Sequence, residues 1–259
     1  MDLGIKDRVA LVCASSKGLG RACAEALAAE GVALFLNGRD AGSLNEAARA
    51  IAAQYGVSVT PVAADLGTPH GREIILRACP SPDILINNAG GPPPGGLKQW
   101  TEADWDRALA TNLRAPVALI GAYIDGMAER GFGRIVNITS SIVRHPIDVQ
   151  GLSAAARAGL HGLVATLVRG VASRNVTVNN ILPGTFATQR LVSNFTFIGM
   201  RQGRTAEEAL AARRSELPAK RFGEPAELGK LCAYLCSVHA AYISGQNILI
   251  DGGAHPQTF

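Results

Sequence analysis

Apolar runs of strand length alternate with segments of helical periodicity along the whole chain. A parallel strand returns to its sheet through a crossover helix and is buried on both faces, so its sequence is almost continuously apolar. Seven runs of this kind occur, at residues 8–14, 32–38, 57–65, 83–90, 134–140, 176–184 and 246–253. They predict an α/β fold, a doubly wound parallel sheet of about seven strands with helices on both faces.

The chain has the size and composition of one large globular domain. Of its 259 residues, 47% are hydrophobic and 18% are charged, and neither a repeat nor a linker divides them. Such a chain can bury a deep core, so we predict a single domain over residues 1–259. Helices are expected at residues 20–31, 43–56, 101–131, 153–174 and 225–237. Residues 186–221 are the least regular part and are predicted to form a lid over a substrate.

Charge, hydropathy and cysteine content limit the kinds of binding partner and the cellular location that we expect for this protein. A net charge of +4 without a long Lys/Arg run argues against nucleic acid. We expect no signal peptide and no apolar stretch that reaches the roughly 20 residues of a membrane span. The five cysteines are scattered, which favours reduced thiols and a cytoplasmic location. Cys232, Cys236 and His239 lack a fourth ligand, so we predict core packing there and no metal site.

A glycine-containing turn, CASSKGLG (13–20), joins the first predicted strand to the first predicted helix. Amides at a helix N-terminus are free to bind an anion, and the helix dipole favours negative charge there. The turn is therefore predicted to hold the pyrophosphate of a dinucleotide, although a plain turn is the alternative. The candidate contacts in it are Ser15, Ser16, Lys17, Gly18 and Leu19.

The end of the second predicted strand, LNGRD (36–40), bears on the choice of cofactor. An NAD-binding chain usually has a carboxylate about 20 residues past the glycines, where it accepts from the ribose 2′-hydroxyl. Here Asn37 and Gly38 are followed by Arg39, whose guanidinium suits a 2′-phosphate. Lys17 is expected to assist it, so we predict NADP(H) in preference to NAD(H). The alternative is that both cations are merely solvated.

Polar and small residues at two further strand ends are also candidate cofactor contacts. Asp65 is placed to accept from the adenine amino group, with a helix N-cap as the alternative. Asn87 and Asn88 close a buried strand, where amides can fasten neighbouring strand ends. Ala89 and Gly90 let the backbone come close to a ligand. We therefore include Asn88, Ala89 and Gly90 in the predicted cofactor site.

These motifs together resemble the short-chain dehydrogenase/reductase family, in particular its 3-oxoacyl-(acyl carrier protein) reductases. CASSKGLG resembles T-G-x-x-x-G-x-G, NNAG (87–90) matches directly, and VNNILPGTFAT (178–188) resembles N-x-I-x-P-G-x-x-x-T. Residues 221–253 resemble the C-terminal segment. The resemblance covers essentially the whole chain and implies a Rossmann-type fold, an oxidoreductase using NADP(H), and a carbonyl or acyl substrate. It also implies a homotetramer or homodimer, packed through the long helices that follow residues 101 and 153.

The same resemblance assigns roles to individual residues. It implies catalytic positions for Asn112, in ATNLRAP, and for Ser140, at the end of RIVNITS. It implies cofactor contacts for Pro183, Gly184 and Thr188. From the residues alone, Ser140 could equally cap a turn and Thr188 could equally be a helix N-cap.

The stretch GLSAAARAGLHGL (151–163) departs from the family pattern. Aligned on the following AGL, the catalytic Y-x-x-x-K of the family falls on Ser153 and Arg157. Counting thirteen positions from Ser140 gives the same result. In the glycine turn, Cys13 and Ala14 replace the threonine and glycine of the family, so a methyl group is added where the backbone passes close to the cofactor.

Three functions are compatible with Ser153 and Arg157 as the catalytic pair. In the first, the protein is an NADP(H)-dependent reductase in which the proton comes from water ordered by Ser140, Ser153 and Arg157, from the substrate, or from His145. Arg157 itself cannot shuttle a proton because its pKa is too high. In the second, the fold binds a nucleotide or metabolite without turnover. In the third, His145 or Asp148 is the base of a non-redox lyase.

The predicted lid contains both apolar and cationic side chains. Phe195, Phe197, Ile198 and Met200 are expected to form an apolar wall. Arginines there could meet a carboxylate or an acyl-carrier phosphate, but AEEALAARRSE has the pattern of an amphipathic helix with a solvated charged face. We therefore expect most of these arginines to be solvated: Arg190, Arg201, Arg204, Arg213 and Arg214.

Overall fold

The computed structural model describes residues 1–256 and contains one parallel sheet of seven strands in the order β3-β2-β1-β4-β5-β6-β7. All neighbouring strands run parallel. The strands are β1 (Val9–Val12), β2 (Ala33–Gly38), β3 (Val59–Ala63), β4 (Ile84–Asn87), β5 (Gly133–Ile138), β6 (Val176–Pro183) and β7 (Asn247–Ile250). Each lies within or one residue outside a predicted apolar run, so the doubly wound α/β fold is confirmed.

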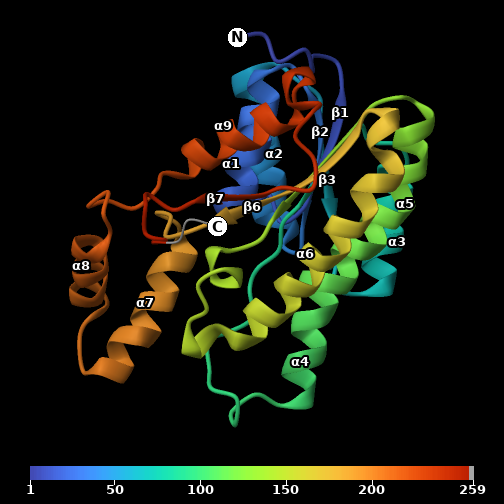
Figure 1. The fold of residues 1–259 in the computed structure, drawn as a ribbon. Coiled ribbons are helices and arrows are strands. Elements are labelled where there is room, and N and C mark those ends of the chain that lie inside the picture. Colours follow the sequence, from blue (N-terminus) through green and yellow to red (C-terminus); the bar gives the residue numbers. More distant parts are fainter. Residues whose placement is uncertain (257–259) are drawn as a thin grey trace.

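Helices cover both faces of this sheet, and each face has its own apolar core (Figure 1). One face packs against α1 (Gly18–Ala29), α2 (Ala41–Tyr55) and α9 (Pro225–Cys236). The other packs against α3 (Pro69–Ala78), α5 (Ala115–Glu129) and α6 (Gly151–Val171). Cys232 and Cys236 are fully buried in the first core, as predicted for packing residues, whereas His239 hydrogen-bonds the carbonyl of Asp2.

The helix expected at 101–131 is divided by a π-helical segment. It consists of α4 (Glu102–Leu109), a π-helix at Ala110–Arg114, and α5. A capping box of Thr101 and Asp104 begins α4, and Pro116 occupies the first turn of α5, where its missing N–H costs little. The π-helix contains Asn112, and such wide turns occur often at functional sites.

Residues 186–221 are more regular than predicted. They form α7 (Gln189–Gln202) and α8 (Ala206–Glu216), a helix pair that projects from the sheet (Figure 1). Thr188 caps α7, and Thr205 begins α8 with a capping box. Both caps are local sequence signals for the start of a helix. The helix α3, begun by a Thr68 N-cap and Pro69, was also not predicted.

One segment, Asp148–Arg174, is long and apolar enough to cross a membrane by length and mean hydropathy. The expectation that no stretch reaches this length was therefore wrong. In the structure a third of its most apolar window is buried, and α6 packs against β6 and the π-helix as a covering helix of the sheet. That packing accounts for the apolar residues on the inner face of α6.

Candidate active site

Four asparagines link the neighbouring strands β4, β5, β6 and β7, from the carboxyl end of β4 to the first residue of β7. Asn87 donates to Asn137, Asn137 donates to Asn180, and Asn180 donates to Asn247, at 2.9, 2.8 and 2.7 Å. These residues face one another in the register of β4, β5, β6 and β7. We call this set the asparagine ladder. It confirms that Asn87 fastens strand ends, and it fixes the edge of the sheet where the site lies.

The glycine turn packs directly against the end of β4. Asn88 donates to the carbonyls of Cys13 and Ala14, and a side chain on Gly20 would lie 2.4 Å from the Ala14 oxygen. Gly20 is therefore required by close packing. Ala14 has φ +46°, a left-handed conformation that is unfavourable for any residue with a Cβ. Ala14 therefore replaces the family's glycine at a position whose backbone conformation favours glycine.

The N-terminus of α1 is open to a ligand. Lys17 stands at the N-cap but makes no side-chain hydrogen bond to the first turn, so the amides of that turn have no side-chain cap. Gly18 has φ +61°, and a Cβ on it would lie 3.8 Å from the methyl group of Thr188. Thr188 therefore lies over the glycine turn while its hydroxyl accepts from the amide of Leu191. Thr188 is therefore the N-cap of α7, and its methyl group still lies next to the glycine turn.

Two predicted cofactor contacts have buried side chains. Ser15 is fully buried, and its hydroxyl donates to the Val12 carbonyl. Asn37 is also fully buried, and its amide donates to the Val62 and Ala64 carbonyls of the neighbouring strand end. Both side chains stabilise strand ends and are not exposed to a cofactor. Their orientation was not predictable, because a hydrophobic pattern does not show which way a polar residue at a strand end turns. Leu19, likewise, packs against the core.

The cations predicted to select the cofactor are exposed at the end of β2. Lys17 and Arg39 make no ion pair within residues 1–256. The nearby Asp40 caps α2 by accepting from the Ser43 amide, which lowers the pKa of its carboxyl, and the charge of Lys17 lowers it further. Asp65 is exposed and is not the cap of α3, because Thr68 has that role.

The remaining predicted cofactor residues lie at the same edge of the sheet. Ala89 is half-buried and Gly90 is exposed, with free space where a Cβ would stand. Pro183 is the buried last residue of β6. A Cβ on Gly184 would lie 2.6 Å from the Cβ of Asp251, so the glycine is needed for packing after β7.

The two residues in place of the family's tyrosine and lysine contact each other. Arg157 donates from Nη1 to the Ser153 hydroxyl one turn earlier on α6, and each residue is only 7% exposed. Burial, and then the charge of Arg190, lower the pKa of Arg157 to about 10, so the group stays cationic near neutral pH. Ser140 accepts weakly from the Ile142 amide, as expected for a serine that caps a turn.

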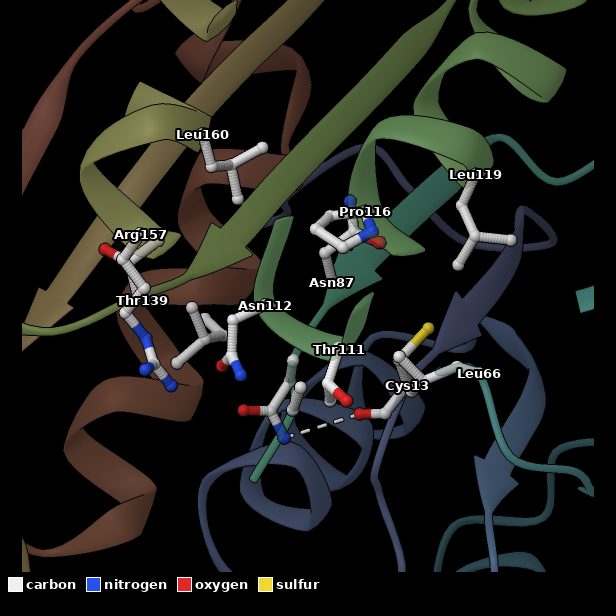
Figure 2. A pocket seen from close by; sticks show the side chains of 13 residues that line it. Cys13, Leu66, Asn87, Thr111, Asn112, Pro116, Leu119, Thr139, Arg157 and Leu160 are labelled. Carbon is white, nitrogen blue, oxygen red and sulfur yellow. Dashed lines mark hydrogen bonds between the residues drawn. The ribbon is translucent and has the colours of Figure 1, made fainter. Parts of the chain in front are cut away.

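A small cavity lies between Arg157 and the π-helix (Figure 2). Arg157 reaches it from α6, Asn112 from the π-helix and Thr139 from the end of β5. Asn112 is buried and donates to the Ala108 carbonyl. The cavity offers about 20 Å³ to a water-sized molecule, which is room for roughly one water. A charged donor, an amide and a hydroxyl therefore surround a space large enough for water.

His161 is a neighbour of the site that the sequence analysis missed. It follows Arg157 by one turn of α6, and its Nε2 lies 2.9 Å from the Thr139 hydroxyl, which donates to the Ile181 carbonyl. Since that hydroxyl proton is already used, Nε2 is the donor in this contact. Burial, and then the charges of Arg144 and Arg157, lower the pKa of His161 to about 4. The i, i+4, i+8 spacing of Ser153, Arg157 and His161 was the available signal.

His145 and Asp148 are both exposed, and the His145 ring contacts the His255 ring at a centroid distance of 5.6 Å. Neither is turned into the cavity beside Arg157, so the structure gives no support to either as a proton donor or base. The loop between the two serines is instead a surface turn.

The lid arginines are exposed or half-buried, as predicted, and Arg190 is among the exposed ones. Arg213 pairs with Glu216 on the exposed face of α8, and Arg214 lies over the Phe222 ring. Arg190 instead donates from α7 to the Pro92 carbonyl at 2.8 Å. In the predicted apolar wall, Met200 is 76% exposed. It therefore does not line a wall in this arrangement.

The buried parallel sheet, with a glycine turn and polar strand ends gathered at its carboxyl edge, defines a doubly wound α/β protein with its site at that edge. The profile of the family described as enoyl-(acyl carrier protein) reductase matches residues 13–255. The chain belongs to this family of short-chain dehydrogenases/reductases, which are oxidoreductases.

Individual relatives agree with this membership. A 3-oxoacyl-(acyl carrier protein) reductase of Vibrio cholerae is 32% identical over 257 residues, which cover 98% of this chain and 99% of that protein. An acetoacetyl-CoA reductase of Cupriavidus necator is 36% identical over 67% of this chain and 66% of its own length. An L-sorbose reductase from Gluconobacter frateurii, solved with NADPH and L-sorbose, is 32% identical with a TM-score of 0.92, covering 98% of each chain.

Proposed function

We propose that this protein is an NADP(H)-dependent oxidoreductase that acts on a carbonyl or alcohol substrate through Ser140, Ser153 and Arg157. When bound, the cofactor supplies the hydride. The observation that carries the proposal is the open N-terminus of α1, which lacks a side-chain cap and lies beside two unpaired cations, Lys17 and Arg39. An uncapped helix N-terminus suits a pyrophosphate, and the cations suit a 2′-phosphate.

The proposed chemistry differs from the family pattern at the proton. Ser140 and Ser153 orient the substrate oxygen by hydrogen bonds, and the charge of Arg157 stabilises negative charge as it develops there. Neither a serine hydroxyl nor a guanidinium is an effective acid near neutral pH. We therefore assign the proton to water, which the cavity beside Arg157 and Asn112 can admit. Asn112 contributes by shaping that cavity from the π-helix.

A fluorescence titration with NADPH and with NADH tests the cofactor proposal. We expect saturable binding of NADPH that is tighter than binding of NADH, because only NADPH offers a phosphate to Lys17 and Arg39. An absence of NADPH binding, or equal affinity for the two nucleotides, would contradict it.

A second candidate function is nucleotide binding without turnover. It is favoured by the contact in which Arg157 already donates to the Ser153 hydroxyl, which competes with the substrate for that group. The chain also offers no substitute phenol nearby, since the Tyr123 hydroxyl is committed to the Cys79 carbonyl. NADPH consumption with a panel of ketones and oxo acids separates the two functions: binding without any consumption supports the second.

The assembly and location are also proposals. We infer a homotetramer or homodimer packed through α5 and α6, whose outward positions carry small side chains such as Ala118, Gly121, Ala158 and Gly162. Light scattering on the purified protein checks this, and a monomer at micromolar concentration would contradict it. All five cysteines are free and buried, which suits a reducing cytoplasm. We infer no nucleic-acid or membrane partner.

A further inference from the structure

The backbone at Gly91 lies between two guanidinium groups that come from different helices. A Cβ built on Gly91 would lie 3.2 Å from Nη2 of Arg190 and 3.6 and 3.7 Å from Nη1 and Nη2 of Arg157. Arg157 belongs to α6, and Arg190 belongs to α7 in the lid. Two groups of the same charge therefore approach one point beside the site.

No carboxylate compensates this charge. Within residues 1–256, every ion pair involves other cations, and neither Arg157 nor Arg190 has an acidic partner within 4.0 Å. Arg157 is 7% exposed and its one side-chain hydrogen bond goes to Ser153, so its other donors have no partner among the described residues. Arg190 is exposed, and its one hydrogen bond goes to the Pro92 carbonyl. A buried, unpaired guanidinium is costly, and the cost is removed when an oxyanion binds.

We propose that Arg157 and Arg190 bind the carboxylate of the substrate, and that the substrate is a 2-oxo acid or the matching 2-hydroxy acid. This inference rests on the proposed function. Guanidinium groups bind carboxylates through paired hydrogen bonds. The position of the carboxylate relative to the carbonyl follows from the Arg157–Ser153 contact. Because the anion-binding and carbonyl-binding groups touch, the site favours a carboxylate and a carbonyl on adjacent carbons.

The reaction balances with the groups already named. The hydride of NADPH forms a C–H bond at C2, the C=O π bond breaks, and NADPH is oxidised to NADP⁺. The oxygen takes a proton from the water beside Arg157, which gives the 2-hydroxy acid, and the hydroxide that is left takes a proton from bulk solvent. The carboxylate is unchanged, and Arg157 and Arg190 hold it throughout.

Calorimetric titration with sodium phenylglyoxylate and with its methyl ester tests the inference, since the two probes differ only in the charge. Each is titrated into the protein alone and into the protein saturated with NADP⁺, where no turnover occurs. We expect the acid to bind roughly tenfold or more tightly than the ester. Arg157→Gln and Arg190→Gln should each remove most of this preference. Arg157→Lys, which keeps the charge, should retain part of it.

Arg204→Gln is the matched control, because it removes the same charge from an exposed position of the lid, and it should leave the preference unchanged. Equal binding of acid and ester overturns the inference. The inference is also overturned if Arg190→Gln binds NADP⁺ more weakly but binds the acid as before, because Arg190 would then contact the cofactor. Inorganic phosphate competing as strongly as the acid would also overturn the 2-oxo acid assignment. If NADP⁺ fails to bind but the cofactor-free protein still prefers the acid, the proposed function fails and the anion site stands.

Discussion

The guanidinium of Arg157 donates a hydrogen bond to the hydroxyl of Ser153, and both side chains are buried on the inner face of α6. The family places a tyrosine and a lysine at these positions. The substitution therefore replaces a phenol and an amine with a serine and an arginine. The arginine keeps a positive charge at the site, but neither side chain is an effective proton donor near neutral pH. The glycine turn and the strand ends around it keep their packing, so the change is concentrated at the proton-donating part of the site.

Ala14→Gly should stabilise the protein. The φ of +46° costs an L-residue about 1 kcal/mol or more, and glycine adopts it freely. We expect the midpoint of thermal unfolding to rise by roughly 2–4 °C, and NADPH to bind more tightly because a methyl group leaves the turn. Asp7→Gly is the control: it relieves a similar φ of +63° far from the site, so it should raise the midpoint without changing NADPH affinity. An unchanged midpoint of thermal unfolding for Ala14→Gly would contradict the claim that the backbone at Ala14 is strained.

Asn137→Ala should destabilise the protein by about 3 kcal/mol. The change breaks two bonds of the asparagine ladder and leaves the buried amides of Asn87 and Asn180 without these partners. Asn247→Ala removes only the terminal bond, and should cost about 1 kcal/mol. Urea unfolding measures both. Equal losses for the two variants would show that the ladder does not act through its central member.

Arg39→Ala should weaken NADPH binding by roughly tenfold, because a charge-assisted hydrogen bond is lost. Binding of NADH should change little, since it has no 2′-phosphate. Arg49→Ala, on the exposed face of the neighbouring α2, is the control for net charge. Fluorescence titration of each nucleotide gives the comparison. The same weakening of NADPH by both variants would indicate a general charge effect in place of a specific contact.

His161 should make stability fall at acid pH. Its folded pKa of about 4 lies below the ordinary value of 6.5 because burial, Arg144 and Arg157 disfavour the charged ring. The unfolded chain therefore binds the proton more readily in this window, so stability is full above pH 6.5 and is lost as the pH falls toward 4. In His161→Gln this part of the dependence should disappear. Urea unfolding at several pH values measures it, and identical profiles for both proteins would refute the assignment.

The sheet was predictable because burial on both faces leaves a continuous apolar run that stops near the strand end. Val57 to Asp65 and Asp83 to Gly90 were thus found with their ends a few residues too long. The division of the helix at 101–131 was not predictable, because the π-helix around Asn112 keeps nearly the same apolar spacing as an α-helix. In the lid, the amphipathic pattern of AEEALAARRSE (206–216) indicated the helix that α8 forms, whereas α7 was not predicted.

At the site, positions were easier to predict than orientations. The spacing placed Ser153 and Arg157 correctly on one helix face, yet it could not show that Asn37 turns into the protein and bonds Ala64. Nor could it show that Arg190 donates to the Pro92 carbonyl whereas Arg213 pairs with Glu216, because both lie in polar helical segments. Orientation depends on which strand or helix packs alongside, and that information is absent from local sequence.

The central claim is that the cofactor end of this site is largely kept while the proton-donating pair is replaced. Measuring NADPH-dependent reduction of ethyl acetoacetate by the wild type and by the double variant Ser153→Tyr with Arg157→Lys tests it most directly. Restoring a positioned acid should raise the rate by roughly 10² to 10⁴-fold, with NADPH affinity little changed. A double variant that still binds NADPH but gains no activity would contradict the claim.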